Sequence, residues 1–263
     1  RRSFYDTTRV AQAIEYLFAL AAELDVDAVS INISLGTNGG AHDNSSAMSR
    51  WIDYALTTPG RSVCVAGGNA GQEAPRFEGD IGFALGRIHT SGRLAATDLE
   101  HELRWIVVGD GGTLQDVSEN ELEIGYPPQD RVAVQVRPPG GAWLTVVEPG
   151  EFMQSEVLGA EQNFTVVSTC NELYDVGNGY NRITVYLSPF ISEQTGVHAI
   201  ASGIWSIRLI GRHVRDGRYH GWIERDDPDE IGRVGTRRFW RFPSFFADGT
   251  NVDDSSLSTL ACG

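Results

Sequence analysis

The chain contains no lysine: its 21 basic residues are all arginine, against 35 acidic residues. Without lysine it has no amine for a Schiff base, no Walker-type phosphate loop and no Ser-Lys dyad. The formal net charge of −14 would repel a phosphate backbone, so nucleic-acid binding is not expected. The densest basic stretch, Arg233 to Arg241, follows an acidic run and is interpreted as a region of surface ion pairs.

Cysteine and long apolar runs are also scarce. The three cysteines, Cys64, Cys170 and Cys262, are widely spaced and lack CxxC or histidine partners, so neither a disulfide framework nor a structural zinc site is expected. No apolar run reaches the ~20 residues of a membrane span, and no signal peptide is visible. The first residue is not methionine, so we expect a segment cut from a longer protein. Nothing in the sequence indicates a cellular compartment.

Residues 1–78 have the pattern of a partial α/β core. Apolar residues recur on one face at helical spacing over residues 6–24 and again over about residues 45–56. Short apolar runs typical of strands occupy residues 29–33 and 62–66, and a glycine-containing turn follows each. A βαβ unit delivers both strand ends to one edge of a parallel sheet, where α/β folds place their chemistry.

Residues 79–227 change to short strand-like runs separated by turn sequences such as Pro138-Pro139-Gly140-Gly141. Strands are expected at residues 101–108, 121–125, 131–137, 142–147, 163–168, 182–187, 203–211 and 219–225. This pattern predicts an antiparallel sandwich of the jelly-roll kind, followed by a return segment at residues 228–263. The predicted fold class is therefore α/β, with a parallel sheet and helices, plus an all-β insert.

Glycine and polar residues follow both apolar runs of the α/β part. The first run continues as Ser34-Leu35-Gly36, and the second as Ala66-Gly67-Gly68-Asn69-Ala70-Gly71. A carboxamide among glycines can project its N–H groups where neighbouring backbone comes close, which an oxyanion-hole donor requires. Asparagine beside glycine is also common in ordinary turns, and the first segment also fits the end of an edge strand.

In this order the two motifs resemble the subtilisin-like serine proteases (subtilases). The stretch Leu35 to Asp43 is similar to the Csp-like branch of that family, which carries a β-sandwich inserted soon after the oxyanion loop. Ile88-His89-Thr90-Ser91-Gly92 and the segment from Gly203 to Trp222 resemble the two edges of that insert. Ser255 to Ala261 is similar to the point where the protease fold resumes.

The resemblance implies roles for individual residues. Asn69 would stabilise the oxyanion formed during peptide-bond hydrolysis. The segment Ser34-Leu35-Gly36 would bind the substrate backbone as an added strand. Ala66-Gly67-Gly68 would border the substrate, with a looser pocket wall than in family members that have alanines there.

Subtilases also require an aspartate, a histidine and a serine nucleophile, and none of the corresponding motifs is present. No Asp-strand or His-Gly helix start precedes residue 29, and no Gly-Thr-Ser-Met-type helix start follows residue 71. His42-Asp43 is not expected to act as a dyad, because adjacent side chains point apart. Since the triad transfers a proton from serine to an oriented histidine, we expect a central fragment of a serine endopeptidase. It would be inactive alone, and the complete enzyme would act on a peptide or protein.

Two other functions remain open: a pseudoprotease scaffold, or a binding module built on the sandwich. A glycan-binding module would need an exposed row of aromatic side chains, although at least two of its four tryptophans are expected in the core. These tryptophans are Trp105, Trp143, Trp205 and Trp222. No cofactor is expected; calcium at Asp226-Asp227-Pro228-Asp229-Glu230 is the alternative to a solvated acidic loop. The partial α/β core cannot cover both faces of its sheet, so exposed apolar surface and a dimer through it are expected.

Overall fold

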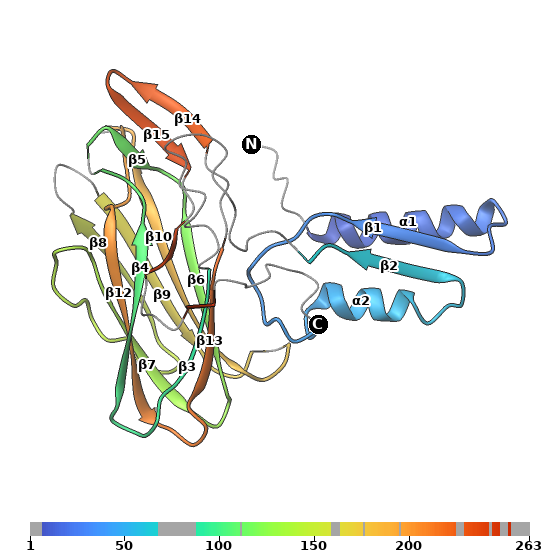
Figure 1. Ribbon diagram of the computed structural model, residues 1–263, viewed down its shortest axis with the longest axis horizontal. Helices are drawn as coiled ribbons and strands as arrows, with labels where there is room; N and C mark the ends of the chain where they lie inside the picture. The colour runs from blue at the N-terminus through green and yellow to red at the C-terminus, as the bar shows by residue number, and fades with distance from the viewer. Residues whose placement is uncertain are drawn as a thin grey trace. The chain divides into compact units, whose positions relative to one another are not determined.

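The computed structural model describes residues 7–67, 88–110, 112–158, 164–175, 177–194, 196–224, 229–241, 244–247 and 252–253. These residues form two compact units, one within residues 7–67 and one within residues 88–253 (Figure 1). Each unit has its own hydrophobic core. The predicted boundary after residue 78 lies outside the described residues and stays a prediction.

The first unit is a small βαβ layer. Its elements are α1 (Thr7–Glu23), β1 (Val29–Ile33), α2 (Ala47–Ala55) and β2 (Arg61–Val65). The two strands pair in parallel from Val29↔Arg61 to Ile33↔Val65. Ser46 caps α2 by accepting a hydrogen bond of 3.1 Å from the N–H of Ser49, which satisfies a donor that the first helical turn leaves unpaired. Neither helix is long and apolar enough to cross a membrane.

Both helices pack against one face of the two-stranded sheet. Ile31 and Ile33 of β1 are buried with Ile14 and Phe18 of α1, and Ile52 of α2 joins the same cluster. Alternate strand residues must point the other way. The exposed residues of that second face are Ser30, Asn32, Ser62 and Cys64. This face is therefore polar, and dimerisation through it stays a prediction.

The second unit is built mainly from two antiparallel sheets. The larger has the strand order β17-β3-β13-β6-β10-β9-β8, with β11 paired to β10. Its strands are β3 (His89–Arg93), β6 (Asn120–Tyr126), β8 (Phe152–Leu158), β9 (Phe164–Glu172), β10 (Asn181–Ser192), β11 (Gly196–His198), β13 (Arg218–Ile223) and β17 (Val252–Asp253). The smaller has the order β16-β4-β12-β7. Its strands are β4 (Glu100–Val107), β7 (Arg131–Arg137), β12 (Gly203–His213) and β16 (Phe245–Phe246).

A third sheet extends from one end of the second unit (Figure 1). Its strands are β5 (Leu114–Asp116), β14 (Asp229–Val234) and β15 (Arg237–Arg241). β14 and β15 are antiparallel, whereas β15 and β5 are parallel. The described strands of the predicted return segment, residues 228–263, thus all pair with strands of the second unit.

The two larger sheets enclose one continuous core. The alternation of strand side chains places Leu103, Trp105 and Val107 of β4 inside it, each no more than 1% exposed. The larger sheet contributes Leu122, Ile124, Val167, Ile183, Val185 and Leu187. Burial of this apolar surface, at about 25 cal/mol per Å², holds the sheets together.

The predicted fold class, α/β with a subtilase-type parallel sheet and helices, is wrong. Strands make up 48% of the structure and helices 13%. In the part of the chain that is described there are two helices, and only β1–β2 and β15–β5 pair in parallel. The helical period is confined to the first unit, so the antiparallel sheets of the longer second unit set the class. Residues 142–147, expected as a strand, contribute a single bridge between Val147 and Val134.

Candidate functional site

The predicted substrate-binding segments follow the two parallel strands. Ser34-Leu35-Gly36 continues from β1, and Ala66-Gly67 continues from β2 at the same edge of the sheet. The N–H of Ala66 donates a hydrogen bond of 2.9 Å to the carbonyl oxygen of Ile33. This bond extends the pairing by one residue, so the two segments leave the sheet side by side.

The main chain at Leu35 and Gly36 is open. Leu35 is 56% exposed, and among the described residues neither Leu35 nor Gly36 uses its N–H or C=O in a hydrogen bond. Asn32 donates its side-chain N–H to the hydroxyl oxygen of Ser34 at 2.8 Å, which fixes the start of the segment. An extended peptide can pair with these free main-chain groups of Leu35 and Gly36 as an additional strand.

The predicted oxyanion donor, Asn69, and its neighbour Gly68 lie outside the described residues. Their roles therefore stay predictions from the sequence. Gly67 is exposed, and a Cβ placed on it would meet no described atom within 4 Å.

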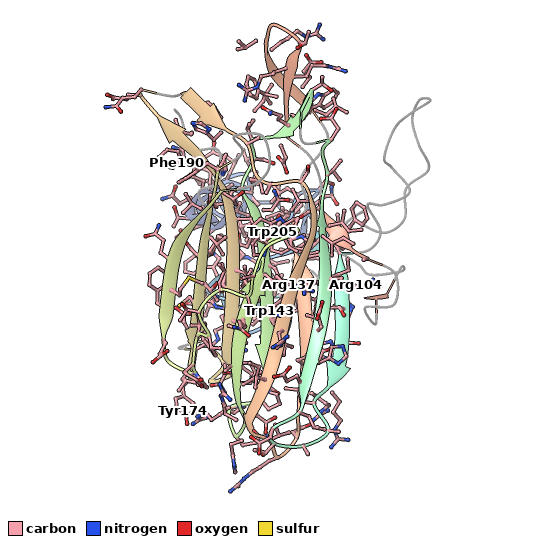
Figure 2. All side chains as sticks on the ribbon, turned by 90° about the vertical axis from the view of Figure 1, so that its left-hand side faces the viewer. Arg104, Arg137, Trp143, Tyr174, Phe190 and Trp205 are labelled. Atoms are coloured by element: carbon pink, nitrogen blue, oxygen red, sulfur yellow. The ribbon has the colours of Figure 1, made fainter. Side chains whose placement is uncertain are left out.

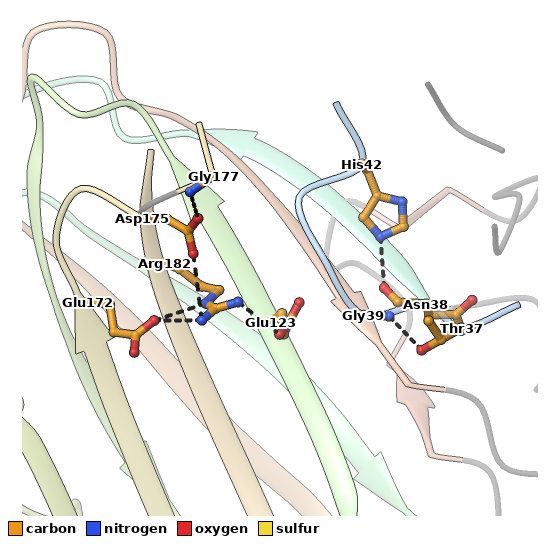
Figure 3. Close-up of polar contacts among 9 residues, drawn as sticks. All are labelled: Thr37, Asn38, Gly39, His42, Glu123, Glu172, Asp175, Gly177 and Arg182. Atoms are coloured by element: carbon orange, nitrogen blue, oxygen red, sulfur yellow. Dashed lines mark hydrogen bonds and ion pairs between the residues drawn. The ribbon is translucent and has the colours of Figure 1, made fainter. Parts of the chain in front are cut away.

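Hydrogen bonds between side chains and the main chain hold the loop that follows Gly36 in shape (Figure 3). The hydroxyl of Thr37 accepts a hydrogen bond of 3.1 Å from the N–H of Gly39. Nε2 of His42 lies 2.7 Å from the carbonyl oxygen of Asn38, and because a carbonyl only accepts, Nε2 carries the proton. The carboxylate of Asp43 accepts the main-chain N–H two residues further on. These contacts give His42 and Asp43 separate roles in the shape of the loop.

Arg182 of β10 is the centre of a charged network on the larger sheet (Figure 3). Its guanidinium group lies 2.6 Å from the carboxylate of Glu172 and 3.7 Å from those of Glu123 and Asp175. Partial burial opposes the charge on Arg182, but the hydrogen bond to Glu172 and the three carboxylates raise its pKa above the usual value. The network therefore links β6, β9 and the loop after β9 to β10.

Glu121 of β6 has a pKa far above the usual value of a glutamate. Burial raises its pKa to about 7, a hydrogen bond with Tyr186 opposes the rise, and the nearby Glu123 and Glu224 add to it. Tyr186 lies directly opposite on β10. Because its pKa lies near 7, Glu121 makes the stability of this sheet sensitive to pH.

Among the described residues no group of three or more His, Cys, Asp or Glu side chains is arranged to hold a metal.

The calcium alternative stays a prediction. Asp226 and Asp227 lie outside the described residues. The carboxylate of Glu230 is held by Arg238 at 2.5 Å and by Arg233 at 3.2 Å. These arginines neutralise Glu230, so this member of the acidic run already has cationic partners.

The four tryptophans considered for a binding surface are all engaged within the fold. Two of them are fully buried: Trp105 and Trp205. The half-buried Trp143 lies beneath guanidinium groups, with Cζ of Arg208 at 3.9 Å and Cζ of Arg137 at 4.6 Å from its ring centre (Figure 2). Trp222 stacks on the ring of His89 with centroids 4.6 Å apart. These four side chains therefore do not form an exposed aromatic row.

Sequence patterns did not indicate the charged groups of the second unit. Glu121 and Glu123 sit at alternate positions of β6 and so share a face, which is a signal that the sequence contains. The partners Arg182 and Tyr186 come from a strand that is distant in the chain, and only the sheet pairing brings them together.

The second unit packs two antiparallel sheets, and the first is a βαβ layer with one parallel pair of strands. A solved protease has a similar fold. That structure is the CspB protease of Clostridium perfringens, to which the chain is similar with a TM-score of 0.62 and 19% sequence identity. The similarity covers 90% of this chain, which spans 42% of that protease chain. Neither a protein-family model nor a curated protein matches the sequence. The likeness at this identity is a likeness of fold.

Proposed function

We propose that this chain is the peptide-binding part of a serine peptidase, inactive by itself, in which Asn69 stabilises the oxyanion. The observation that carries the proposal is the open main chain at Leu35 and Gly36 beside the end of β2. The fold similarity to the CspB protease supports a protease-related role. Because this chain spans 42% of that structure, the complete peptidase activity is assigned to a longer protein that contains it.

The substrate would bind through its main chain. Donors and acceptors alternate along Leu35 and Gly36, so an extended peptide would gain hydrogen bonds that do not depend on its side chains. The Ile33–Ala66 hydrogen bond sets the spacing between this segment and the loop that leads to Asn69. Asn69 follows Ala66 by three positions, a span of at most about 10 Å in extended chain. Its carboxamide would therefore be within reach of a bound scissile carbonyl.

This chain would supply the oxyanion donor, and the rest of the enzyme would supply the catalytic triad. As the carbonyl is attacked, negative charge develops on its oxygen, and an N–H donor aimed at that oxygen lowers the barrier by about 2.7–4 kcal/mol. The serine, the histidine that accepts its proton and the carboxylate that orients the histidine would lie outside these residues. The chain alone would thus bind peptide without cleaving it.

A pseudoprotease scaffold is the second candidate. The open edge at Leu35 and Gly36 favours it as much as it favours an enzyme, because adding a strand requires no nucleophile. The two candidates differ only in whether an activated serine is present in the longer protein.

A fluorophosphonate probe, which reacts with an activated serine, separates them. We expect the probe to label the longer protein and not residues 1–263 alone. Asn69→Ala should lower kcat by about 10²–10³-fold. Asn178→Ala is the matched control: it removes a carboxamide that accepts from the N–H of Tyr180 at 2.9 Å in the second unit, and turnover should not change. A folded longer protein that binds peptide without labelling would favour the scaffold. Failure to label and to bind peptide would overturn both.

A further inference from the structure

An open hollow of about 650 Å³ lies at the end of the second unit where β12 turns into β13. Five residues line this arginine hollow: Arg93, Gln129, Arg215, Asp216 and Arg218. They come from the end of β3, the turn before β7 and the β12–β13 hairpin. Three arginines and one aspartate thus share this lining in a chain whose net charge is −14.

The hairpin that carries the hollow is held from beneath by Asp130. The carboxylate of Asp130 is fully buried and accepts hydrogen bonds from three consecutive main-chain N–H groups. These come from Arg215 at 2.7 Å, Asp216 at 3.1 Å and Gly217 at 2.6 Å. Gly217 has a φ of +77°, and a Cβ there would lie 2.0 Å from the carbonyl oxygen of Leu94. The turn therefore requires glycine and has a fixed backbone.

The arginines are positioned by hydrogen bonds that leave donors unused. Arg93 donates through Nε to the main-chain oxygen of Asp216 at 2.8 Å. Arg218 donates through Nε and Nη2 to the carboxylate of Asp216 at 2.7 and 2.6 Å. Arg215 donates through Nε to Nε2 of His213 at 3.2 Å. The hydrogen bond from Arg218 and, more weakly, the charge of Arg93 lower the pKa of Asp216. Within the described residues neither Arg93 nor Arg215 forms an ion pair with a carboxylate, so their Nη groups remain as donors.

We propose that the arginine hollow binds a dianionic oxyanion, either a phosphate group or a dicarboxylate. Three guanidinium charges against the carboxylates of Asp216 and of Asp130 beneath the hairpin leave the lining net positive, and the Nη groups of Arg93 and Arg215 offer two separate sets of donors to a dianion. A guanidinium fork donates paired hydrogen bonds to the oxygens of phosphate and carboxylate groups alike. Gln129, which also lines the hollow, supplies an uncharged amide donor. The hollow belongs to the second unit and involves none of the predicted substrate-binding residues.

Affinity at this hollow would come from its fixed geometry. Because Asp130 holds the hairpin before any ligand arrives, little backbone entropy is lost on binding, and the cost is confined to ordering the arginine side chains. The arginines are exposed to solvent, so salt would screen their attraction for the ligand. Binding should therefore be measurable at low ionic strength and should weaken steadily as sodium chloride is added.

Titration of the whole chain with inorganic phosphate, succinate and acetate tests the proposal, with binding followed by calorimetry. We expect saturable binding of at least one dianion, with an affinity at least about tenfold higher than that of acetate, which has a single charge. Tighter binding of phosphate would assign the site to phosphate-bearing ligands. Tighter binding of succinate would assign it to dicarboxylates. Equal affinity for acetate and both dianions, or no saturable binding, would overturn the proposal.

Arginine variants show whether a bound anion occupies this hollow. Arg93→Gln and Arg215→Gln should each weaken dianion binding by about tenfold or more, because each removes charge-assisted donors. Arg212→Gln is the control: Arg212 lies on the same hairpin but pairs with Glu148 at 2.5 Å, and its removal should leave affinity unchanged. Arg215 is exposed, so its variant should fold even if the Arg93 variant does not. Unchanged affinity in Arg215→Gln would contradict the assignment.

Discussion

Trp105 and Trp205 lie directly opposite each other on β4 and β12, and both are fully buried. Their indole N–H groups differ in hydrogen bonding. The N–H of Trp205 donates to the carbonyl oxygen of Ala201 at 2.9 Å. The N–H of Trp105 has no acceptor among the described residues. A buried polar group without a partner costs about 1–3 kcal/mol, so of these two donors it is the one on Trp205 whose burial is offset by a described hydrogen bond.

Replacing each of the two tryptophans by phenylalanine should therefore have unequal effects. Both changes remove similar volume, but Trp205→Phe leaves the carbonyl of Ala201 without its donor, whereas Trp105→Phe removes an unpaired N–H. We expect Trp205→Phe to lower the free energy of unfolding by about 1–3 kcal/mol more than Trp105→Phe. Urea unfolding followed by circular dichroism measures both. Equal losses would contradict this account.

Asp130→Asn should destabilise the second unit. Asparagine keeps one accepting oxygen and presents an N–H₂ group to main-chain N–H donors, so at least one charge-assisted hydrogen bond is lost. We expect the free energy of unfolding to fall by about 2–4 kcal/mol. Asp216→Asn is the comparison, because its partner Arg218 is 69% exposed and an exposed ion pair contributes little to stability. A larger loss in Asp216→Asn would refute the anchoring role of Asp130.

Glu121 should make stability fall as the pH rises toward neutrality. Its pKa is about 7 in the folded protein against 4.5 for an ordinary glutamate, so between these values the folded chain holds a proton that the unfolded chain has released. The free energy of unfolding should therefore decrease across this range, by about 1–2 kcal/mol after allowance for partial exposure.

Unfolding measured at about pH 5 and about pH 7.5 tests this dependence. Glu121→Gln should remove most of the difference between the two values, because the amide does not titrate. The control is Glu102→Gln, which removes a half-exposed carboxylate that pairs with Arg137 at 3.1 Å. If the Glu121 variant kept the full pH dependence, another group would be responsible.

Leu35→Pro should weaken peptide binding without unfolding the first unit. Proline removes the main-chain N–H, and that N–H makes no hydrogen bond to the described part of the chain. We expect at least about a fivefold loss of affinity for an extended peptide inhibitor of the longer protein, from the loss of one hydrogen bond. Leu35→Ala keeps the N–H and should retain most of the affinity. A matching loss in both variants would assign the effect to the side chain.

The elements of the first unit could be predicted because their signals are local. The helical spacing of Ile14 and Phe18 and the apolar run of β1 are properties of neighbouring residues. The βαβ order also predicted that Ser34-Leu35-Gly36 and Ala66-Gly67 would meet at one sheet edge, and the structure confirms this. The role of Asn69 stays a prediction.

Several strands of the second unit could not be predicted in the same way. β8 lacks a strong apolar alternation and is a strand because β9 pairs with it along its full length. β14 and β15 are rich in charge, and their pairing with each other and with β5 defines them. The arginine hollow is less visible still, because Arg93 and Asp216 are 123 positions apart. Such features depend on pairing between distant segments, for which one sequence contains no local signal.

The carboxylate of Asp130 binds the β12–β13 hairpin only through main-chain N–H groups. These hydrogen bonds do not depend on which side chains the hairpin carries. Arg215 and Asp216 can therefore be replaced by other residues without loss of the turn, whereas Gly217 cannot. Reversing the charge of one arginine would remove the net positive charge of the hollow, and with it the preference for anions, on an unchanged backbone. The selectivity of this end of the molecule can thus diverge, by natural drift or by engineering, independently of its foldability.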